Sequence, residues 1–450
     1  MNKTKLSLFL LVPVLSSGAI VGCNTRGGSS SDVISISIVS DNAEYTTMNT
    51  FIKKYKEIPG NENKKFKVVK MTNYNDYIFN SFLYDELTDI IQVYDYNAEY
   101  YTNADLDGAG TSLLQSVTPF MKKDGINESD FFDSIIEMTK CKTGSDEMYW
   151  VPRDYNKVVC AYNKKIFDIA GVDYPTDNWT WDDFAAAARK IHEVTGNPAV
   201  TTLEYNSLAF STVTQWKEGY NFYAMDGTDF AFNGDTAPIA FIFDLLTTLQ
   251  AEGAIADYGI QNEIGSNIEA DWIAFGDSAM VMLSSNQFQA LSNVAAENGI
   301  TLALATIPRV YPDGQSGMVV RSSQQMSIYK GSEKKEMAAN FINFFINSVE
   351  ANKILNCERG VSINSDVLAA LKADEEKTNE VTAKVYTIID LIGSFADAAN
   401  SSPAEPAANE EISDVLKKTY FQGLTEGKFD SAQAAADQFW AEAQEIWAKF

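Results

Sequence analysis

The chain has little histidine, and this shortage excludes several classes of enzyme. Its 450 residues include a single histidine, His192. Catalytic triads and zinc sites each usually need at least one well-placed imidazole. We interpret His192 as structural, because it lies in a helix-like stretch before a Gly-Asn-Pro turn. Phosphate-binding loops and Gly-x-Ser-x-Gly elbows are also missing from the sequence. The chain therefore indicates neither a triad hydrolase nor a zinc enzyme, and we expect no cofactor and no metal.

Long apolar runs are confined to the first residues. Lys3 and Lys5 precede an apolar stretch at 6–20, which is too short to span a bilayer comfortably and is interrupted by Pro13. Residues 20–23, Ile-Val-Gly-Cys, resemble the lipobox cut by the bacterial lipoprotein signal peptidase. The resemblance implies a signal peptide at 1–22, a lipid anchor on Cys23 and a flexible, polar tether at 23–32. A short membrane helix or an ordinary secretory signal is the alternative interpretation.

The chain also has fewer basic than acidic residues, and it has only four cysteines. The chain has 35 Lys and Arg against 61 Asp and Glu, which gives a formal net charge of −26. Such a surface repels nucleic acid and anionic lipid, so neither is an expected partner. Once Cys23 is acylated, Cys141, Cys160 and Cys357 remain, and three cysteines form no disulfide framework. A bond between Cys141 and Cys160 stays possible, although we favour buried free thiols.

Strand and helix patterns alternate in the first hundred residues. Strands are predicted at 34–38, 65–71 and 89–93, with helices at about 42–55 and 76–84 between them. Connections of this length favour a mainly parallel sheet covered by helices. Ligands of such sheets collect beyond the carboxyl ends of the strands, where polar residues stand at 40–44 and 94–96.

The rest of the chain also gives local predictions. Two strands, at 148–152 and 157–163, flank the segment Arg153-Asp154-Tyr155. Thr180 and Asp183 have the spacing of a capping box before an alanine-rich helix. Residues 332–355 read as one periodic helix, and residues 431–450 as a closing amphipathic helix. The Asp-rich turn at 103–108 resembles the start of a calcium loop, but it lacks the glutamate at position twelve, so we interpret it as a turn.

Four segments, in this order, resemble the extracellular solute-binding proteins of bacterial ABC importers, in the family of the maltose and multiple-sugar receptors. They are the Leu-Leu to Thr-Pro segment at 113–120, the Tyr-Trp-Val-Pro strand followed by Tyr-Asn-Lys and Trp-Asp-Asp between 148 and 184, the Phe-Gly-Asp-Ser-Ala-Met turn at 275–280, and residues 328–342 followed by Gly-Val-Ser-Ile-Asn at 360–364. Each segment alone is weak, but their order across nearly the whole chain is specific.

The resemblance implies an α/β, two-lobed fold of the periplasmic-binding-protein type, with three hinge crossings and a ligand cleft between the lobes. From the matched segments we expect crossings near 154–158, 320–323 and 346–349. The N-terminal lobe would hold residues 33–154 plus 324–347, and the C-terminal lobe residues 155–323 plus 348–450. Hinged lobes that close on a ligand give a membrane permease a state to sense.

The resemblance further implies a substrate-binding lipoprotein, not an enzyme, which captures a sugar or an oligosaccharide and delivers it to ABC permease subunits. We expect a monomer, held at the cell membrane by the lipid on Cys23. Sugars need aromatic faces for their rings and planar polar groups for their hydroxyls. The candidate ligand-binding residues, mostly at strand ends and crossings, are Asp41, Glu44, Tyr94, Asp95, Tyr96, Asp154, Tyr155, Trp216, Asn286, Gln287 and Arg321.

Three alternatives remain open at this point. A solvated surface charge is about as good an interpretation of Asp95 and of Arg321 as a ligand contact. Clefts rich in carboxylates also serve glycosidases, so a surface glycan hydrolase is the leading enzyme alternative. The third alternative is a receptor for a solute other than sugar, such as a cationic metabolite attracted by the acidic surface.

Overall fold

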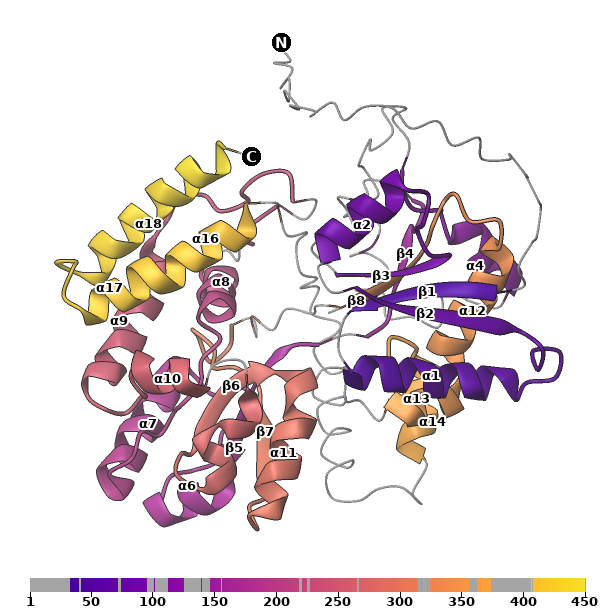
Figure 1. The fold of residues 1–450 in the computed structure, drawn as a ribbon. Helices are drawn as coiled ribbons and strands as arrows, with labels where there is room; N and C mark the ends of the chain where they lie inside the picture. The colour runs from indigo at the N-terminus through magenta and orange to yellow at the C-terminus, as the bar shows by residue number, and fades with distance from the viewer. Residues whose placement is uncertain are drawn as a thin grey trace, which may run out of the picture.

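The computed structural model of the protein describes most of the chain. The described residues are 33–39, 42–71, 74–94, 101, 112–124, 139, 146–154, 156–217, 221–224, 227–264, 267–314, 317, 322, 324–355, 362–373, 406 and 408–449. They form two lobes that lie side by side, each built around its own sheet (Figure 1).

The first lobe contains a five-stranded sheet with the order β2-β1-β3-β8-β4. Its elements are β1 (Val33–Val39), α1 (Asn42–Lys56), β2 (Lys65–Met71), α2 (Tyr74–Leu83), β3 (Ile90–Tyr94), α4 (Thr118–Asp124), β4 (Trp150–Pro152), and, later in the chain, β8 (Gln324–Ile328), α12 (Lys335–Asn347), α13 (Val349–Leu355) and α14 (Ser365–Ala373). The helix α1 lies on one side of this sheet and α2 on the other (Figure 1).

The second lobe contains a three-stranded sheet with the order β6-β5-β7. Its elements are β5 (Val158–Asn163), α6 (Lys164–Ala170), α7 (Trp181–Thr195), α8 (Tyr205–Gln215), α9 (Ala237–Ala251), α10 (Tyr258–Ile264), η2 (Ile268–Ala270), η3 (Trp272–Phe275), β6 (Met280–Ser284), η4 (Ser285–Gln287), α11 (Phe288–Glu297), β7 (Leu302–Ala305), and, at the end of the chain, α16 (Asn409–Val415), η6 (Leu416–Phe421), α17 (Gln422–Thr425) and α18 (Ala432–Trp447). Helices α16, α17 and α18 pack on the same side of the lobe as α9 (Figure 1).

The alternating pattern of β1 explains how the first sheet is buried. Ile34, Ile36 and Ile38 are fully buried and pack in one core cluster with Phe51 of α1 and Phe345 of α12. The rings of Phe51 and Phe345 lie 4.5 Å apart between centroids. A second cluster, which includes Ile78 of α2 with Ile91 and Trp150, covers the opposite face. The two clusters together cover both faces of the sheet.

The prediction of a mainly parallel sheet is confirmed for three strands and wrong for the others. β1 pairs in parallel with both β2 and β3. β8 lies antiparallel between β3 and β4, because it enters the first sheet after the chain has passed through the second lobe. In the second sheet, β6 and β7 are both antiparallel to β5.

The predicted single helix over 332–355 is also wrong, because two helices occupy this region. Ser348 has an extended backbone, with φ −85° and ψ 120°, and separates α12 from α13. Helix α13 contacts α1 and α14, so both α13 and α14 lie with the first lobe. These two helices belong to the residues that we expected in the second lobe, which we predicted to resume at residue 348.

Other local predictions are confirmed. Thr180 and Asp183 form the expected capping box at the start of α7, where each side chain accepts a hydrogen bond from the other residue's backbone N–H. Ser431 caps α18 through a bond from Ala434 N. The thiol of Cys160 is buried and free, as we favoured, and burial raises its pKa. Cys141, the turn at 103–108 and the leader and tether at 1–32 lie outside the described residues.

Candidate functional site

Two chain segments lead from one sheet to the other, and the structure describes each of them in part. Residues 153–157 lead from β4 of the first sheet to β5 of the second, and the return from β7 to β8 takes place between residues 306 and 323. The two segments meet where Arg153 N donates a 3.0 Å hydrogen bond to Gln324 O. Side chains on this junction can respond to the position of either lobe.

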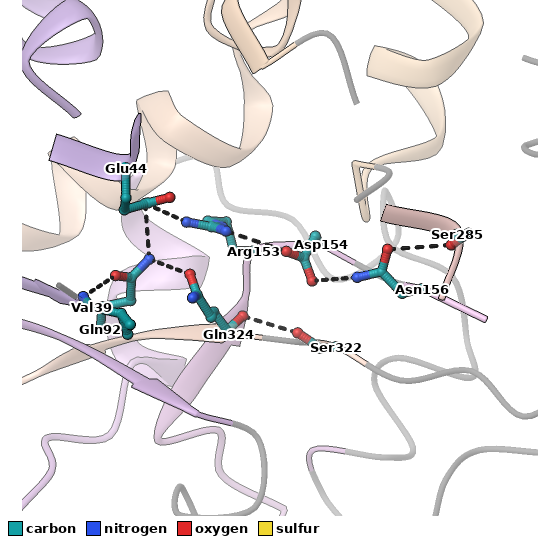
Figure 2. A network of polar contacts seen from close by, with 9 residues as sticks. All are labelled: Val39, Glu44, Gln92, Arg153, Asp154, Asn156, Ser285, Ser322 and Gln324. Atoms are coloured by element: carbon teal, nitrogen blue, oxygen red, sulfur yellow. Dashed lines mark hydrogen bonds and ion pairs between the residues drawn. The ribbon is translucent and has the colours of Figure 1, made fainter. Parts of the chain in front are cut away.

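The first-lobe half of the junction is a buried polar network (Figure 2). Glu44, in the first turn of α1, accepts a 2.5 Å bond from Arg153 Nη1 and a 3.1 Å bond from Gln92 Nε2, both at Oε1. Gln92 accepts from Val39 N at 2.8 Å and donates to Gln324 Oε1 at 2.6 Å. Glu44 is 3% exposed and Arg153 is 2% exposed, so water screens this ion pair little.

The network continues into the second lobe. Arg153 Nη2 lies 3.5 Å from Asp154 Oδ2, so one guanidinium faces two carboxylates. Asn156 Nδ2 donates to Asp154 Oδ1 at 3.3 Å, and Ser285 Oγ of η4 donates to Asn156 Oδ1 at 3.3 Å (Figure 2). A chain of polar contacts therefore links α1 of one lobe to η4 of the other.

Lys157 follows Asn156 in the chain, and its ammonium has no hydrogen-bond partner among the described residues. It is 2% exposed, and within the part of the chain that the structure describes no atom accepts a hydrogen bond from its Nζ. Its backbone is held firmly, because Lys157 N donates to Ser285 Oγ at 3.1 Å and Lys157 O accepts from Ser285 N at 2.8 Å. Burial lowers the pKa of the Lys157 ammonium to about 8, since water no longer solvates the charge.

Trp216 and Tyr311 form an aromatic pair in the second lobe. Trp216 caps the C-terminal end of α8, and its ring centroid lies 6.1 Å from that of Tyr311 and 5.7 Å from that of Phe241. Tyr311 is 40% exposed. The indole Nε1 of Trp216 has no hydrogen-bond acceptor among the described residues. The exposed ring of Tyr311 suits a ligand with apolar faces, and Trp216 Nε1 beside it is a buried donor.

The remaining candidates in the second lobe lie on η4. Gln287 Oε1 accepts a 3.1 Å bond from Ser284 N and so completes a capping box within the same turn. Asn286 Oδ1 is buried and receives no hydrogen bond from any described residue. Asn286 is therefore better placed than Gln287 to accept a hydrogen bond from a ligand hydroxyl.

The structure brings some of the predicted site residues together. Glu44 and Asp154 share the guanidinium of Arg153, whereas Trp216 lies in a separate aromatic group. Tyr94 is the last residue of β3, and its side chain is outside the description. The other candidates outside the described residues are Asp41, Asp95, Tyr96, Tyr155, Arg321 and the proposed anchor Cys23.

Sequence reasoning missed several members of the network, although the sequence carried a signal for some. Gln92 interrupts the buried apolar run of β3, and Gln324 starts the buried strand β8. A polar side chain within a buried strand must find a hydrogen-bond partner. Arg153 and Lys157 lie on either side of the candidates Asp154 and Tyr155. Ser285 gave no signal, because serine is common in turns.

The described part of the chain holds no group of three or more His, Cys, Asp or Glu side chains arranged to bind a metal ion. It also holds no helix that is both long enough and apolar enough to span a membrane.

Comparison with known proteins gives a consistent result. The family model for bacterial extracellular solute-binding proteins matches residues 43–351, a range that includes every strand of both sheets except β1 and the two segments that lead from one sheet to the other. The arabinooligosaccharide-binding protein of Bacillus subtilis is 32% identical over 108 residues, which is 24% of this chain and 23% of that protein. The alignment thus spans less than a quarter of that relative's length.

Solved structures show the same fold over nearly the whole chain. An extracellular solute-binding protein of family 1 from Alicyclobacillus acidocaldarius is 21% identical, with a TM-score of 0.71 and coverage of 92% of this chain and 98% of that one. An oligogalacturonide-binding protein from Yersinia enterocolitica, solved with saturated digalacturonic acid, is 16% identical, with a TM-score of 0.70 and coverage of 93% and 99%. At such identities the likeness establishes the two-lobed fold.

Proposed function

The chain belongs to the bacterial extracellular solute-binding proteins, and from that premise we propose that it captures a sugar or an oligosaccharide between its lobes and delivers it to the permease of an ABC importer. Its family consists of binding proteins rather than enzymes. The observation that carries the proposal is the extent of the family match, which covers seven of the eight described strands and the two segments that lead from one sheet to the other.

The names of related proteins support a carbohydrate ligand. One relative is named for an arabinooligosaccharide and one structural neighbour for an oligogalacturonide. A further neighbour is named for a cyclic maltosyl-maltose. These ligands differ in charge and in size, so they support a carbohydrate without choosing one.

The described side chains offer the two kinds of contact that sugars require. Trp216 and Tyr311 provide ring faces for stacking, and Trp216 Nε1 provides a hydrogen-bond donor. Asn286 Oδ1 provides an acceptor at the lobe junction. In this proposal the ligand contacts both lobes, and the closed form that it stabilises is the one that the permease recognises.

The N-terminal sequence supports a lipid anchor on Cys23, after removal of residues 1–22. The protein would then be a monomer held outside the cytoplasm by its acyl chains. Cys23→Ser should move the protein from the membrane fraction to the medium and abolish incorporation of labelled palmitate. Retention of Cys23→Ser in the membrane fraction would contradict the anchor and favour an N-terminal membrane helix.

Calorimetry with a panel of neutral and acidic mono- and oligosaccharides tests the ligand class. We expect one sugar to bind stoichiometrically, without turnover. Tyr311→Ala should weaken that binding by about three- to tenfold, because an aromatic contact contributes about 0.5–1.5 kcal/mol. Tyr174→Ala is the matched control, since Tyr174 is a tyrosine of the same lobe with nearly the same exposure, 39% against 40%.

Each alternative function predicts a different result. Release of smaller sugars from an oligosaccharide by the purified protein would favour the glycan hydrolase. Binding of a cationic metabolite, with an affinity that falls steeply as salt is added, would favour the non-sugar receptor, because neutral sugars respond little to ionic screening. Absence of binding to every sugar in the panel would overturn the proposal.

A further inference from the structure

Lys157 carries a buried ammonium that no side chain of the described residues neutralises. Two backbone hydrogen bonds to Ser285 fix its position, yet its Nζ has no hydrogen-bond acceptor in the described part of the chain. Burial is the only cause of its lowered pKa, and no charged side chain contributes to that shift. Near neutral pH, a pKa of about 8 still leaves roughly nine-tenths of the amine protonated.

The charged groups of the adjoining network do not compensate Lys157. Arg153 pairs with Glu44 and with Asp154, and this pairing leaves those carboxylates committed to the guanidinium. A buried ammonium without an anion loses its hydration and gains nothing in return. An anion that entered the junction would supply the missing partner.

The neighbours of Lys157 indicate which class of molecule would carry that anion. Lys157 is the last residue of the segment that leads from β4 to β5, and it is bonded to Ser285 beside Asn286. Asn286 Oδ1 is a buried acceptor that no described donor reaches. A molecule that carries both a carboxylate and hydroxyl groups matches a cation and a hydrogen-bond acceptor on residues that Ser285 connects.

We propose that Lys157 binds the carboxylate of an acidic sugar, so that the solute is a uronic acid or an oligosaccharide that contains one. This inference rests on the proposed function, since it names the class of sugar. A single ammonium matches the single charge of a carboxylate and can donate up to three hydrogen bonds. The net charge of −26 repels anions at long range, so an acidic sugar needs a local cation of this kind.

The test compares digalacturonate with its dimethyl ester, which has nearly the same size and no charge. Calorimetry near pH 7 is run on the wild-type protein, on Lys157→Met and on Lys165→Met. Lys165 is an exposed lysine of the same lobe, so this control changes the net charge equally without altering the buried site. Succinate is titrated as a carboxylate that is not a sugar.

We expect the wild-type protein to prefer digalacturonate over the ester by about ten- to a hundredfold, the range for one charged hydrogen-bonded contact. Lys157→Met should lose this preference, whereas Lys165→Met should keep it. Lys157→Gln retains a hydrogen-bond donor without the charge, and it should also lose the preference. This second variant shows whether the loss is specific to methionine.

A second measurement needs no substitution. Digalacturonate requires the protonated amine, so its affinity for the wild-type protein should fall about tenfold between pH 7 and pH 9, as the Lys157 ammonium titrates near pH 8. The affinity for any neutral ligand should stay constant over this range. An unchanged affinity for digalacturonate would overturn the inference even if every variant failed to fold.

The other outcomes separate this inference from the function on which it rests. Equal binding of ester and acid, or an unchanged preference in Lys157→Met, would overturn the role of Lys157 and leave a sugar receptor standing. Succinate that binds as tightly as digalacturonate would overturn the sugar assignment of the carboxylate. A protein that binds neither acidic nor neutral sugars would overturn both proposals.

Discussion

Arg153 and Lys157 are two buried cations four residues apart, and the fold treats them differently. Arg153 faces Glu44 and Asp154, and Gln92 supports the same carboxylate oxygen of Glu44. Lys157 has only its backbone bonds to Ser285 within the described chain. A planar guanidinium with five donors can serve two carboxylates at once, whereas an ammonium acts as a compact point charge. The first cation therefore fits a structural role and the second a role in binding.

The substitution Lys157→Met should stabilise the protein without ligand. Because burial lowers the folded-state pKa from 10.5 to about 8, holding the charge at about pH 7 costs the folded protein about 3 kcal/mol. Urea unfolding should show a gain of up to that size. Between about pH 8 and 10.5 the unfolded chain holds a proton that the folded protein has lost, so the wild-type protein gains stability as pH rises and the difference shrinks. Equal stability of the two proteins at neutral pH would contradict this account.

The ion pair between Glu44 and Arg153 should behave as a coupled unit. Arg153→Gln leaves a carboxylate that is 97% buried without its cation, and it should cost about 3–5 kcal/mol of unfolding free energy. Glu44→Gln should also destabilise. In the double variant both charges are gone, so its loss should be smaller than the sum of the two single losses by at least about 1 kcal/mol. Additive losses, measured by urea unfolding, would show that the two groups act independently.

The sequence predicted which residues lie at the site better than it predicted which side chains they contact. Glu44 and Asp154 were identified because they follow strands, but their pairing with Arg153 depends on contacts 109 residues apart in the chain for Glu44. No local pattern encodes such a contact. Lys157 gave no local warning either, because a lysine before a strand is ordinarily exposed. Its backbone is bonded to Ser285, which lies 128 residues away in the chain.

At the scale of elements, Asp89 connects the start of β3 to β1 and to the segment after β8 through hydrogen bonds. Its carboxylate accepts bonds from Ser35 N at 2.8 Å and Ser35 Oγ at 2.7 Å, and from Ser332 Oγ at 2.7 Å. Lys334 Nζ lies 3.5 Å away. Burial alone would raise the pKa of Asp89, but these hydrogen bonds and Lys334 together lower it. One side chain thus connects β1, β3 and the segment between β8 and α12.

The substitution Asp89→Asn should destabilise the first lobe by about 1–3 kcal/mol, because an amide cannot accept all of these hydrogen bonds. Since the folded-state pKa is lowered, the carboxylate stabilises above its ordinary pKa of 3.8, and this contribution disappears as pH falls through and below that value. Urea unfolding at about pH 7 and at about pH 3 should show a difference between wild type and variant that shrinks in acid. Asp168→Asn, an exposed position in the second lobe, is the control. A difference that does not depend on pH would contradict this role.

Elements with local signals were predicted well, and elements set by distant partners were not. The capping box of Thr180 and Asp183 lies within four residues and was correct. The break at Ser348 escaped prediction, because the apolar period continues across it in α12 and α13. Asn352 Nδ2 compensates for the break by donating to the carbonyls of Phe345, Ile346 and Ser348. The direction of β8 also escaped, since β3, its partner, precedes it by more than 200 residues.

At the scale of the whole molecule, the ordered family segments predicted the two-lobed fold, which the structural comparisons establish. The expected crossing near residues 346–349 stays a prediction, although α13 packs on α1 and α14 packs on α13. A chain that passes repeatedly between lobes can leave one lobe at any exposed loop, so short motifs constrain such a boundary weakly.

A ligand that contacts both lobes should make the molecule more compact. The segment at residues 153–157 is short and takes part in a polar chain from Glu44 through Arg153 and Asp154 to Ser285, so relative motion of the lobes must bend or break contacts at this junction. A ligand favours the closed arrangement only by the difference between its binding free energies for the closed and the open arrangement. X-ray scattering of the purified protein should therefore show a smaller radius of gyration with a saturating sugar that calorimetry has shown to bind. A sugar that does not bind should leave the radius of gyration unchanged.

At about 100 times its dissociation constant the same ligand should add about 2.7 kcal/mol to the unfolding free energy. Tight, stabilising binding without any change in scattering would mean that the lobes are already held together by the junction, and the permease would then have to recognise the ligand-bound surface rather than closure.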